Sequence, residues 1–205
     1  MLRTIAALIS LVVVMAACSG SPATSSGPTP VGQTPPPAGQ TPPLSLVPDQ
    51  PLADAFPDEI GGEPLPVQSA SGPSVLTFFG TTPESEISAF LATMGKGIDD
   101  LSAAYAFNLI ANPTNAMDIK GIGILAVRVK GVPATDLLPR VSQLVITDKP
   151  GAVVGQTNMS GKTVTTIGLP DADPDDIEYL YAYGDAVFEI GGSAELVAEV
   201  LSKLP

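Results

Sequence analysis

The chain has 205 residues, of which 21 are acidic and nine are basic, and it contains no His and no Trp. Arg3 is the only basic residue before Lys96, so residues 18–205 carry eight basic and 21 acidic groups and a net charge of −13. This balance excludes nucleic acid and anionic lipid headgroups as direct partners, because both are bound through Lys and Arg. Cys18 is the only Cys. The composition therefore leaves out the His base and the N/S zinc sites, and it predicts no cofactor.

The first residues have the pattern of an export signal. Arg3 supplies a positive charge, and residues 5–15 form an apolar run that is too short to cross a bilayer as a helix. The segment Met15-Ala16-Ala17-Cys18 follows. It resembles the lipobox of bacterial lipoproteins, in which an aliphatic residue and two small residues precede an invariant Cys. Met15 differs from the usual Leu of that motif.

The resemblance to lipoproteins implies how the chain is processed and where it is held. Residues 1–17 are expected to be a signal peptide, and Cys18 is expected to carry a diacylglyceryl group and a further fatty acid such as palmitate. Two or three acyl chains give stable attachment to a membrane. The expected location is the outer face of the cell membrane, or the outer membrane or periplasm in an organism with two membranes. The alternative is an ordinary secretory signal with a chance Cys.

Residues 18–50 are predicted to be a disordered tether. The 32 residues from Ser19 to Gln50 include nine Pro and only one charged residue, with many Ser, Thr and Gly. Such a segment buries too little apolar surface to offset the entropy of ordering. Its ends would lie roughly 30 Å apart as a coil and up to about 100 Å apart as polyproline II. Residues 51–205 are predicted to form a single domain, which matches the usual domain size.

Three segments of this domain have the apolar spacing of amphipathic helices. The first is predicted to begin at Pro83 with Thr82 as its cap and to end before Gly95. The second runs over residues 133–145 with a bend at Pro139, and the third begins at Ser193. The residues expected to face inward are Ile87, Phe90, Leu91 and Met94 in the first, Leu137, Leu138, Val141, Leu144 and Val145 in the second, and Leu196, Val197, Val200, Leu201 and Leu204 in the third.

Alternating patterns between these segments predict antiparallel strands with one buried and one solvated face. Residues 103–109 and 125–130 have this pattern, with Ala103, Tyr105, Phe107 and Leu109 expected on one buried face. Segments near 65–70 and 162–169 are also predicted to be strands.

Residues 179–183 and 186–190 predict a hairpin around a two-residue turn, Gly184-Asp185. The pairs Tyr183–Ala186, Tyr181–Phe188 and Tyr179–Ile190 would place every aromatic ring on one face, with Leu180 and Glu189 on the other. On this register the tyrosines favour a place in the core over the lining of a ligand pocket.

These elements predict an α+β fold in which an antiparallel sheet carries about three helices on one face. Residues 125–145 and 187–204 are each a strand, a Gly and a helix, and residues 76–94 are a weaker echo. The pattern indicates a possible strand-strand-helix repeat, with chance similarity between short apolar segments as the alternative.

Two glycine motifs imitate nucleotide-binding sequences. Residues 155–163 resemble a P-loop, but five residues separate Gly155 from Gly161-Lys162-Thr163, where a P-loop has four. A β-branched run follows Thr163, where a P-loop needs the start of a helix. Residues 158–161 are better interpreted as a turn. Gly121 and Gly123 fall within a predicted strand, where glycine eases a bulge or close packing.

The only candidate metal site is an acidic loop. Asp171, Asp173 and Asp175, followed by Asp176 and Glu178, gather carboxylates of the kind that bind calcium. The EF-hand pattern requires Gly and Glu at positions that Asp176 and Ala182 occupy here. A solvated acidic loop is the main interpretation, and weak calcium binding is the alternative.

The sequence favours a non-enzymatic binding or adaptor domain, anchored to a membrane through Cys18, because it offers no catalytic motif. The expected partner is an envelope protein, a wall component or a small ligand. The alternative is a carrier that encloses an apolar ligand between helices and sheet, where Ala103, Ala104, Ala106, Ala182 and Ala186 would leave room. A hydrolase ranks last, because it would need carboxylates that converge in a cleft, with at least one raised pKa.

Overall fold

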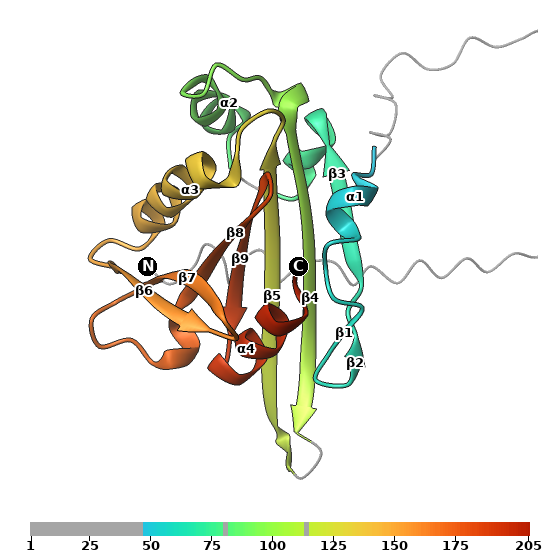
Figure 1. The fold of residues 1–205 in the computed structure, drawn as a ribbon, viewed down its shortest axis with the longest axis vertical. Coiled ribbons are helices and arrows are strands. Elements are labelled where there is room, and N and C mark those ends of the chain that lie inside the picture. Colours follow the sequence, from blue (N-terminus) through green and yellow to red (C-terminus); the bar gives the residue numbers. More distant parts are fainter. Residues whose placement is uncertain (1–46, 80–81, 113–114) are drawn as a thin grey trace, which may run out of the picture. The chain divides into compact units, whose positions relative to one another are not determined.

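The computed structural model of the protein describes residues 47–79, 82–112 and 115–205 (Figure 1). The predicted signal peptide (1–17), Cys18 and residues 19–46 of the predicted tether lie outside the described residues. Asp49 is buried and belongs to the folded part, so this part extends to a few residues before the predicted boundary at residue 51. Within the described ranges, no helix combines the length and the apolar character needed to cross a membrane.

The fold is α+β, as predicted. A seven-stranded antiparallel sheet has the strand order β3-β4-β5-β9-β8-β7-β6, and β1 and β2 form a separate two-stranded ribbon. In chain order the elements are α1 (Gln50–Ala53), β1 (Glu59–Ile60), β2 (Glu63–Pro64), β3 (Val67–Ser71), the 3-10 helix η1 (Gly72–Thr77), α2 (Glu84–Ala92), the 3-10 helix η2 (Ile98–Asp100), β4 (Leu101–Asn112), β5 (Asn115–Val129), α3 (Ala134–Asp148), β6 (Val153–Met159), β7 (Lys162–Gly168), the 3-10 helix η3 (Pro174–Asp176), β8 (Glu178–Tyr183), β9 (Ala186–Gly192) and α4 (Ala194–Lys203).

The hairpin formed by β8 and β9 has the predicted register. Tyr183 pairs with Ala186, Tyr181 with Phe188 and Tyr179 with Ile190. Gly184 has a φ of 61°, the left-handed conformation that the two-residue turn requires. Local turn chemistry and the alternation of side chains together set this register, which is why the sequence specifies it well.

The helices lie on both faces of the sheet, so the prediction that all three pack on one face is wrong. One core contains Phe188 and Ile190 with the apolar residues of α1 and α4. The other contains Leu180 and Val187 with those of α2 and α3. The physical reason is that both alternating sets of side chains in the central strands are apolar or small. Ala104, Ala106 and Ala126 lie on the faces that the alternation predicts to be solvated, but all three are fully buried, so β4 and β5 are not half-solvated strands there.

The strand-strand-helix order recurs along the chain without forming a spatial repeat. The β4–β5 hairpin leads into α3 and the β8–β9 hairpin leads into α4. These two helices pack against opposite faces of the sheet.

The helix boundaries differ slightly from those predicted. The N-cap of α2 is Pro83 rather than Thr82, and Gly95 follows the helix with a φ of 67°, which confirms the predicted stop. Helix α3 continues to Asp148 with Pro139 inside it, and Leu144 is exposed rather than inward. The five residues that are predicted to face inward in the third helix are all buried, although Leu204 lies just beyond the end of α4 as its C-cap. Ser193 caps this helix only through its backbone position, since its buried hydroxyl has no hydrogen-bond partner among the described residues.

Candidate functional site

The predicted calcium candidates lie in an exposed loop that leads through η3 into β8. Asp171, Asp173 and Asp175 are all exposed, and the Asp173 carboxylate accepts a hydrogen bond from the Asp175 backbone N–H at 3.3 Å. Among the residues that the structure describes, no three His, Cys, Asp or Glu side chains are grouped so that they could hold a metal ion. The three aspartates are therefore not brought together as a metal site.

The two glycine motifs are parts of strands and turns. Residues 155–163 lie within the β6–β7 hairpin, whose turn residues Ser160 and Gly161 have φ values of 52° and 76°. This confirms the interpretation of residues 158–161 as a turn. Gly121 and Gly123 lie within β5, as predicted. The close approach of two backbones involves Gly121 and Gly192 of the neighbouring strand β9. A Cβ added at Gly192 would lie 2.7 Å from the Gly121 carbonyl oxygen.

Asp49 fastens the start of the folded part to the middle of the sheet. Its carboxylate forms an ion pair with Arg128 of β5 and accepts the backbone N–H of Leu52, which caps α1. Burial raises the pKa of Asp49, but hydrogen bonds from Ser102, Leu52 and Arg128 outweigh it and hold the pKa below its ordinary value. Arg128 also lies 3.9 Å from Asp185 in the β8–β9 turn. Arg128 of β5 thus connects Asp49, at the start of α1, with the β8–β9 hairpin.

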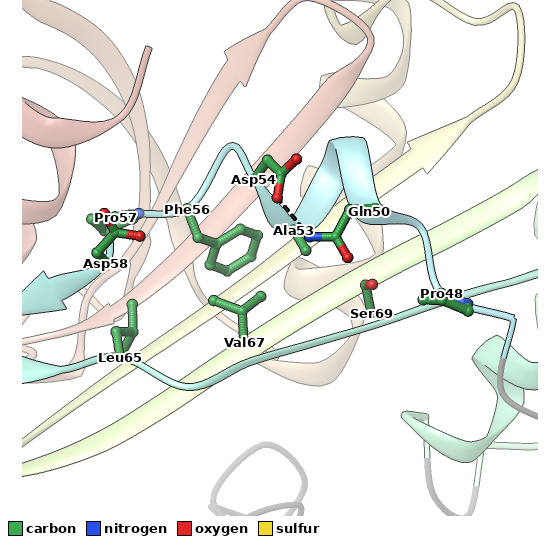
Figure 2. A pocket seen from close by; sticks show the side chains of 10 residues that line it. All are labelled: Pro48, Gln50, Ala53, Asp54, Phe56, Pro57, Asp58, Leu65, Val67 and Ser69. Atoms are coloured by element: carbon green, nitrogen blue, oxygen red, sulfur yellow. Dashed lines mark hydrogen bonds between the residues drawn. The ribbon is translucent and has the colours of Figure 1, made fainter.

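A surface pocket opens beside α1, and we call it the α1 pocket (Figure 2). It has a volume of about 370 Å³. In Figure 2, Val67 and Ser69 point from β3 toward the segment that carries Ala53 and Phe56. Its lining residues come from the start of the folded part, α1, the segment after α1, and β3: Pro48, Gln50, Ala53, Asp54, Phe56, Pro57, Asp58, Leu65, Val67 and Ser69.

The α1 pocket has a buried apolar base and a polar rim. Phe56 is buried and packs against Phe188 of β9, with the ring centroids 5.7 Å apart. The rim residues Gln50, Asp54 and Asp58 are exposed, and the Gln50 amide donates a hydrogen bond to Asp54 at 2.6 Å. No Lys or Arg belongs to the lining. The pocket therefore favours a compact positively charged or neutral group over an anion.

Two glutamates lie close together on the α3 face of the sheet. Glu178 of β8 is opposite Gly191 of β9, and Glu189 is two residues before Gly191 on the same face. Such diagonal neighbours have Cα atoms about 7–8 Å apart. Lys149, just after α3, donates a hydrogen bond to Glu178 at 2.7 Å. The sequence predicts only that Leu180 and Glu189 share a face, because the position of Lys149 depends on the packing of α3.

The surroundings of Glu189 favour its protonated form. Burial, followed by the nearby carboxylate of Glu178, raises the pKa of Glu189 to about 7, and Lys149 offsets part of this effect. Asp148 adds a further repulsion. A carboxyl group that titrates near neutral pH can exchange a proton with a bound molecule. The α1 pocket is formed by other residues, so the glutamates and that pocket are separate features.

The tyrosines and alanines belong mainly to the packed layers. Tyr179 is buried, Tyr181 is half-buried and donates a hydrogen bond to the Pro205 carbonyl at 2.9 Å, and Tyr183 is exposed. Tyr105 packs edge-on against Phe78, with their ring centroids 5.0 Å apart. Of the five alanines that the carrier hypothesis uses, Ala182 is half-buried and the rest are buried in the two cores.

The α1 pocket could not be predicted from the sequence, because Pro48 and Gln50 lie in the predicted tether and the contact of this segment with the strand near residues 65–70 depends on the tertiary structure. One local signal was present, since Asp49 followed by Pro51 has the pattern of a helix cap with Pro near the first position. The comparisons with known proteins add no further assignment: no protein-family model, curated protein or solved structure matches this chain.

Proposed function

We propose that this protein is a lipoprotein of the bacterial cell envelope, anchored through Cys18, whose folded domain binds a partner at the α1 pocket and has no enzymatic activity. The observation that carries the binding role is the pocket itself, with its buried apolar base and the carboxylates of Asp54 and Asp58 at its rim. The lipobox-like segment that ends at Cys18 supports the anchor.

The charge of the pocket determines the chemistry of the proposed partner. Two carboxylates and no basic side chain in the lining favour a group such as a primary amine or a guanidinium. Lys side chains of envelope proteins and amino groups of wall components both present such groups. A small amine with a short apolar part also fits a volume of about 370 Å³.

The anchor is tested by growing cells that express the protein with radiolabelled palmitate. The proposal expects label on the wild-type chain and none on Cys18→Ala, together with release of the Cys18→Ala protein from the membrane fraction. A wild-type chain that carries no label and is recovered free of membranes would overturn the anchored location.

The binding role is tested with a zero-length carbodiimide crosslinker, which joins a carboxylate to an amine in direct contact. Applied to intact cells, it should yield a discrete adduct in which mass spectrometry finds Asp54 or Asp58 as the linked residue. The double variant Asp54→Asn and Asp58→Asn should lose the adduct, whereas Asp171→Asn, an exposed carboxylate elsewhere, should keep it. An adduct that survives the double variant would assign the partner to another surface.

The non-enzymatic character is supported by the absence of His and of a second Cys from the sequence. Native mass spectrometry of residues 18–205 with Cys18→Ser, followed by organic extraction, tests the carrier alternative. A copurifying apolar molecule would make carriage of that molecule the leading function. A mass that matches the polypeptide alone would leave the α1 pocket as the proposed site.

A further inference from the structure

One edge of the seven-stranded sheet has a row of free backbone groups. Strand β6 lies at the end of the strand order, and among the described residues it pairs only with β7. The two-residue turn joins Met159 and Lys162 as a hydrogen-bonded pair, and such pairs alternate along an antiparallel ladder. The backbone N–H and C=O groups of Val154, Gln156 and Asn158 therefore point away from β7. They form a donor and acceptor row for an added strand.

The free edge of β6 lacks the features by which proteins usually protect an edge strand. Its seven residues include no Pro and no charged residue, and its pairing with β7 is continuous, without a bulge. Val153 and Val154, which point to opposite faces, are 56% and 48% exposed. An added strand would therefore meet an apolar side chain on each face of the sheet.

The opposite edge of the sheet is covered by the chain itself. The backbone N–H of Ser71 in β3 donates to the Val47 carbonyl at 2.8 Å, and the Asp49 N–H donates to the Ser69 hydroxyl at 3.1 Å. The segment before α1 thus occupies the outer side of β3. The two edges of one sheet differ in this respect, and β6 is the edge that remains available within the described residues.

Charge near β6 is asymmetric. Residues 150–161 contain no charged side chain, but the acidic loop with Asp171, Asp173 and Asp175 lies beyond the first residue of β6. Val153 pairs with Gly168, and a Cβ added at Gly151 would lie 3.8 Å from Leu169 at the start of that loop. Figure 1 shows the loop after β7 at the same end of the sheet as the start of β6. A strand beside β6 would have one of its ends at this same end of the sheet (Figure 1).

From this edge we infer that β6 binds an extended segment of a partner protein, which adds an eighth strand to the sheet and carries Lys or Arg at the end beside the acidic loop. Main-chain hydrogen bonds to Val154, Gln156 and Asn158 supply the attachment, and the acidic loop selects the basic partner. A second copy of this chain is disfavoured as the occupant, because each copy carries a net charge of −13 beyond residue 17. This surface is distinct from the α1 pocket, and it does not depend on the function proposed for that pocket.

The test uses residues 18–205 with Cys18→Ser, labelled with ¹⁵N, and two synthetic peptides with blocked ends. Both peptides begin with the same five residues, in which Thr and Val alternate. One peptide then ends in Lys-Lys, and the other ends in Glu-Glu. In the antiparallel arrangement, the C-terminal end of the peptide lies beside Val153. The inference expects amide shifts at Val154, Gln156 and Asn158, and at least about fivefold tighter binding of the Lys peptide at low salt, with the ratio approaching one at high salt.

The variant Gln156→Pro removes one outward N–H and no ladder hydrogen bond, so the sheet tolerates it on an edge strand. It should weaken peptide binding at least tenfold, while the matched variant Gln156→Thr, which keeps the N–H, should bind as wild type. Should Gln156→Pro fail to fold, Val154→Pro, which also removes one outward N–H and no ladder hydrogen bond, provides the same comparison with Val154→Thr as its control. Amide shifts confined to other strands, or equal binding by Gln156→Pro and Gln156→Thr, would overturn the inference. A concentration-dependent dimer that Gln156→Pro abolishes would overturn it in favour of a second copy.

Discussion

Asp49, the residue just before α1, forms an ion pair with Arg128 in the middle of the sheet. The Asp49 side chain is 6% exposed and that of Arg128 is 24% exposed, so the pair is largely shielded from water. Breaking a shielded pair leaves the remaining charge without its partner. The pair therefore fixes the position of α1, and with it the α1 pocket.

The variant Asp49→Asn should lower the free energy of unfolding by about 2 to 3 kcal/mol at pH 7, because it removes the charge that holds Arg128. Urea denaturation measures this loss. Asp54→Asn, which alters an exposed carboxylate in the same segment, is the control and should change stability by less than about 0.5 kcal/mol. Because the folded pKa of Asp49 is lowered, its contribution is present above the unfolded value of 3.8 and is lost as the pH falls through the folded pKa. The difference in the free energy of unfolding between wild type and Asp49→Asn should therefore shrink as the pH falls below about 4, and a constant difference down to pH 2 would contradict this assignment.

Glu189 should make the protein less stable as the pH rises. Its folded pKa of about 7 exceeds the ordinary value of 4.5, so between these values the folded state binds more protons than the unfolded state. Glu189→Gln should therefore be more stable than wild type by about 2 to 3 kcal/mol at pH 8, and equal to it near pH 4. Urea denaturation across this range tests the difference. Glu195→Gln serves as the control, since that side chain is 82% exposed. An equal gain at pH 4 and pH 8 would show that titration of Glu189 is not the cause.

Gly192 should tolerate no side chain. Its φ is 150°, and an added Cβ would lie 2.7 Å from the Gly121 carbonyl oxygen, so Gly192→Ala combines backbone strain with a clash between β9 and β5. The expected loss is about 2 to 4 kcal/mol in the free energy of unfolding. Gly62→Ala is the matched control, because Gly62 has a φ of 78° and open space around it, and it should lose only about 1 kcal/mol. Thermal and urea denaturation measure both variants. If Gly192→Ala lost no more stability than Gly62→Ala, the clash would be relieved by a movement of β9.

A substitution at Ala104 tests whether the side chains on the α4 face of the sheet are buried in a core. It is fully buried in the cluster that contains Phe188, whereas an arrangement with helices on one face only would leave it in solvent. Ala104→Asp should therefore abolish the cooperative thermal transition or lower the free energy of unfolding by at least about 3 kcal/mol. Ala89→Asp on the exposed side of α2 is the control. Wild-type stability of Ala104→Asp would contradict the burial of this face.

Local patterns allowed much of the fold to be predicted. The stripe of Leu196, Val197 and Val200 gave α4, and the turn at Gly184 gave the register of the β8–β9 hairpin. Strand β6 was missed because its polar residues, such as Gln156 and Asn158, have no apolar alternation. An edge strand exposed on both faces has no need of such alternation.

The candidate site depended on contacts that no local pattern encodes. Asp49 was assigned to the tether by its composition, but its burial follows from the position of Arg128, which lies 79 residues away along the chain. The α1 pocket brings together residues from the start of the folded part and β3 in the same way.

The sequence by itself determined the charge of the protein, the absence of His, the α+β class, the helices and the hairpin register. These properties follow from composition, from the periods of helices and strands, and from turn chemistry, all of which act over a few residues. The tertiary structure alone decided that α4 and α3 cover opposite faces, that β6 is an open edge among the described residues, and that burial raises the pKa of Glu189 to about 7. Each of these properties depends on which distant segments exclude water from a given side chain or backbone group, and that is fixed only when the sheet is assembled.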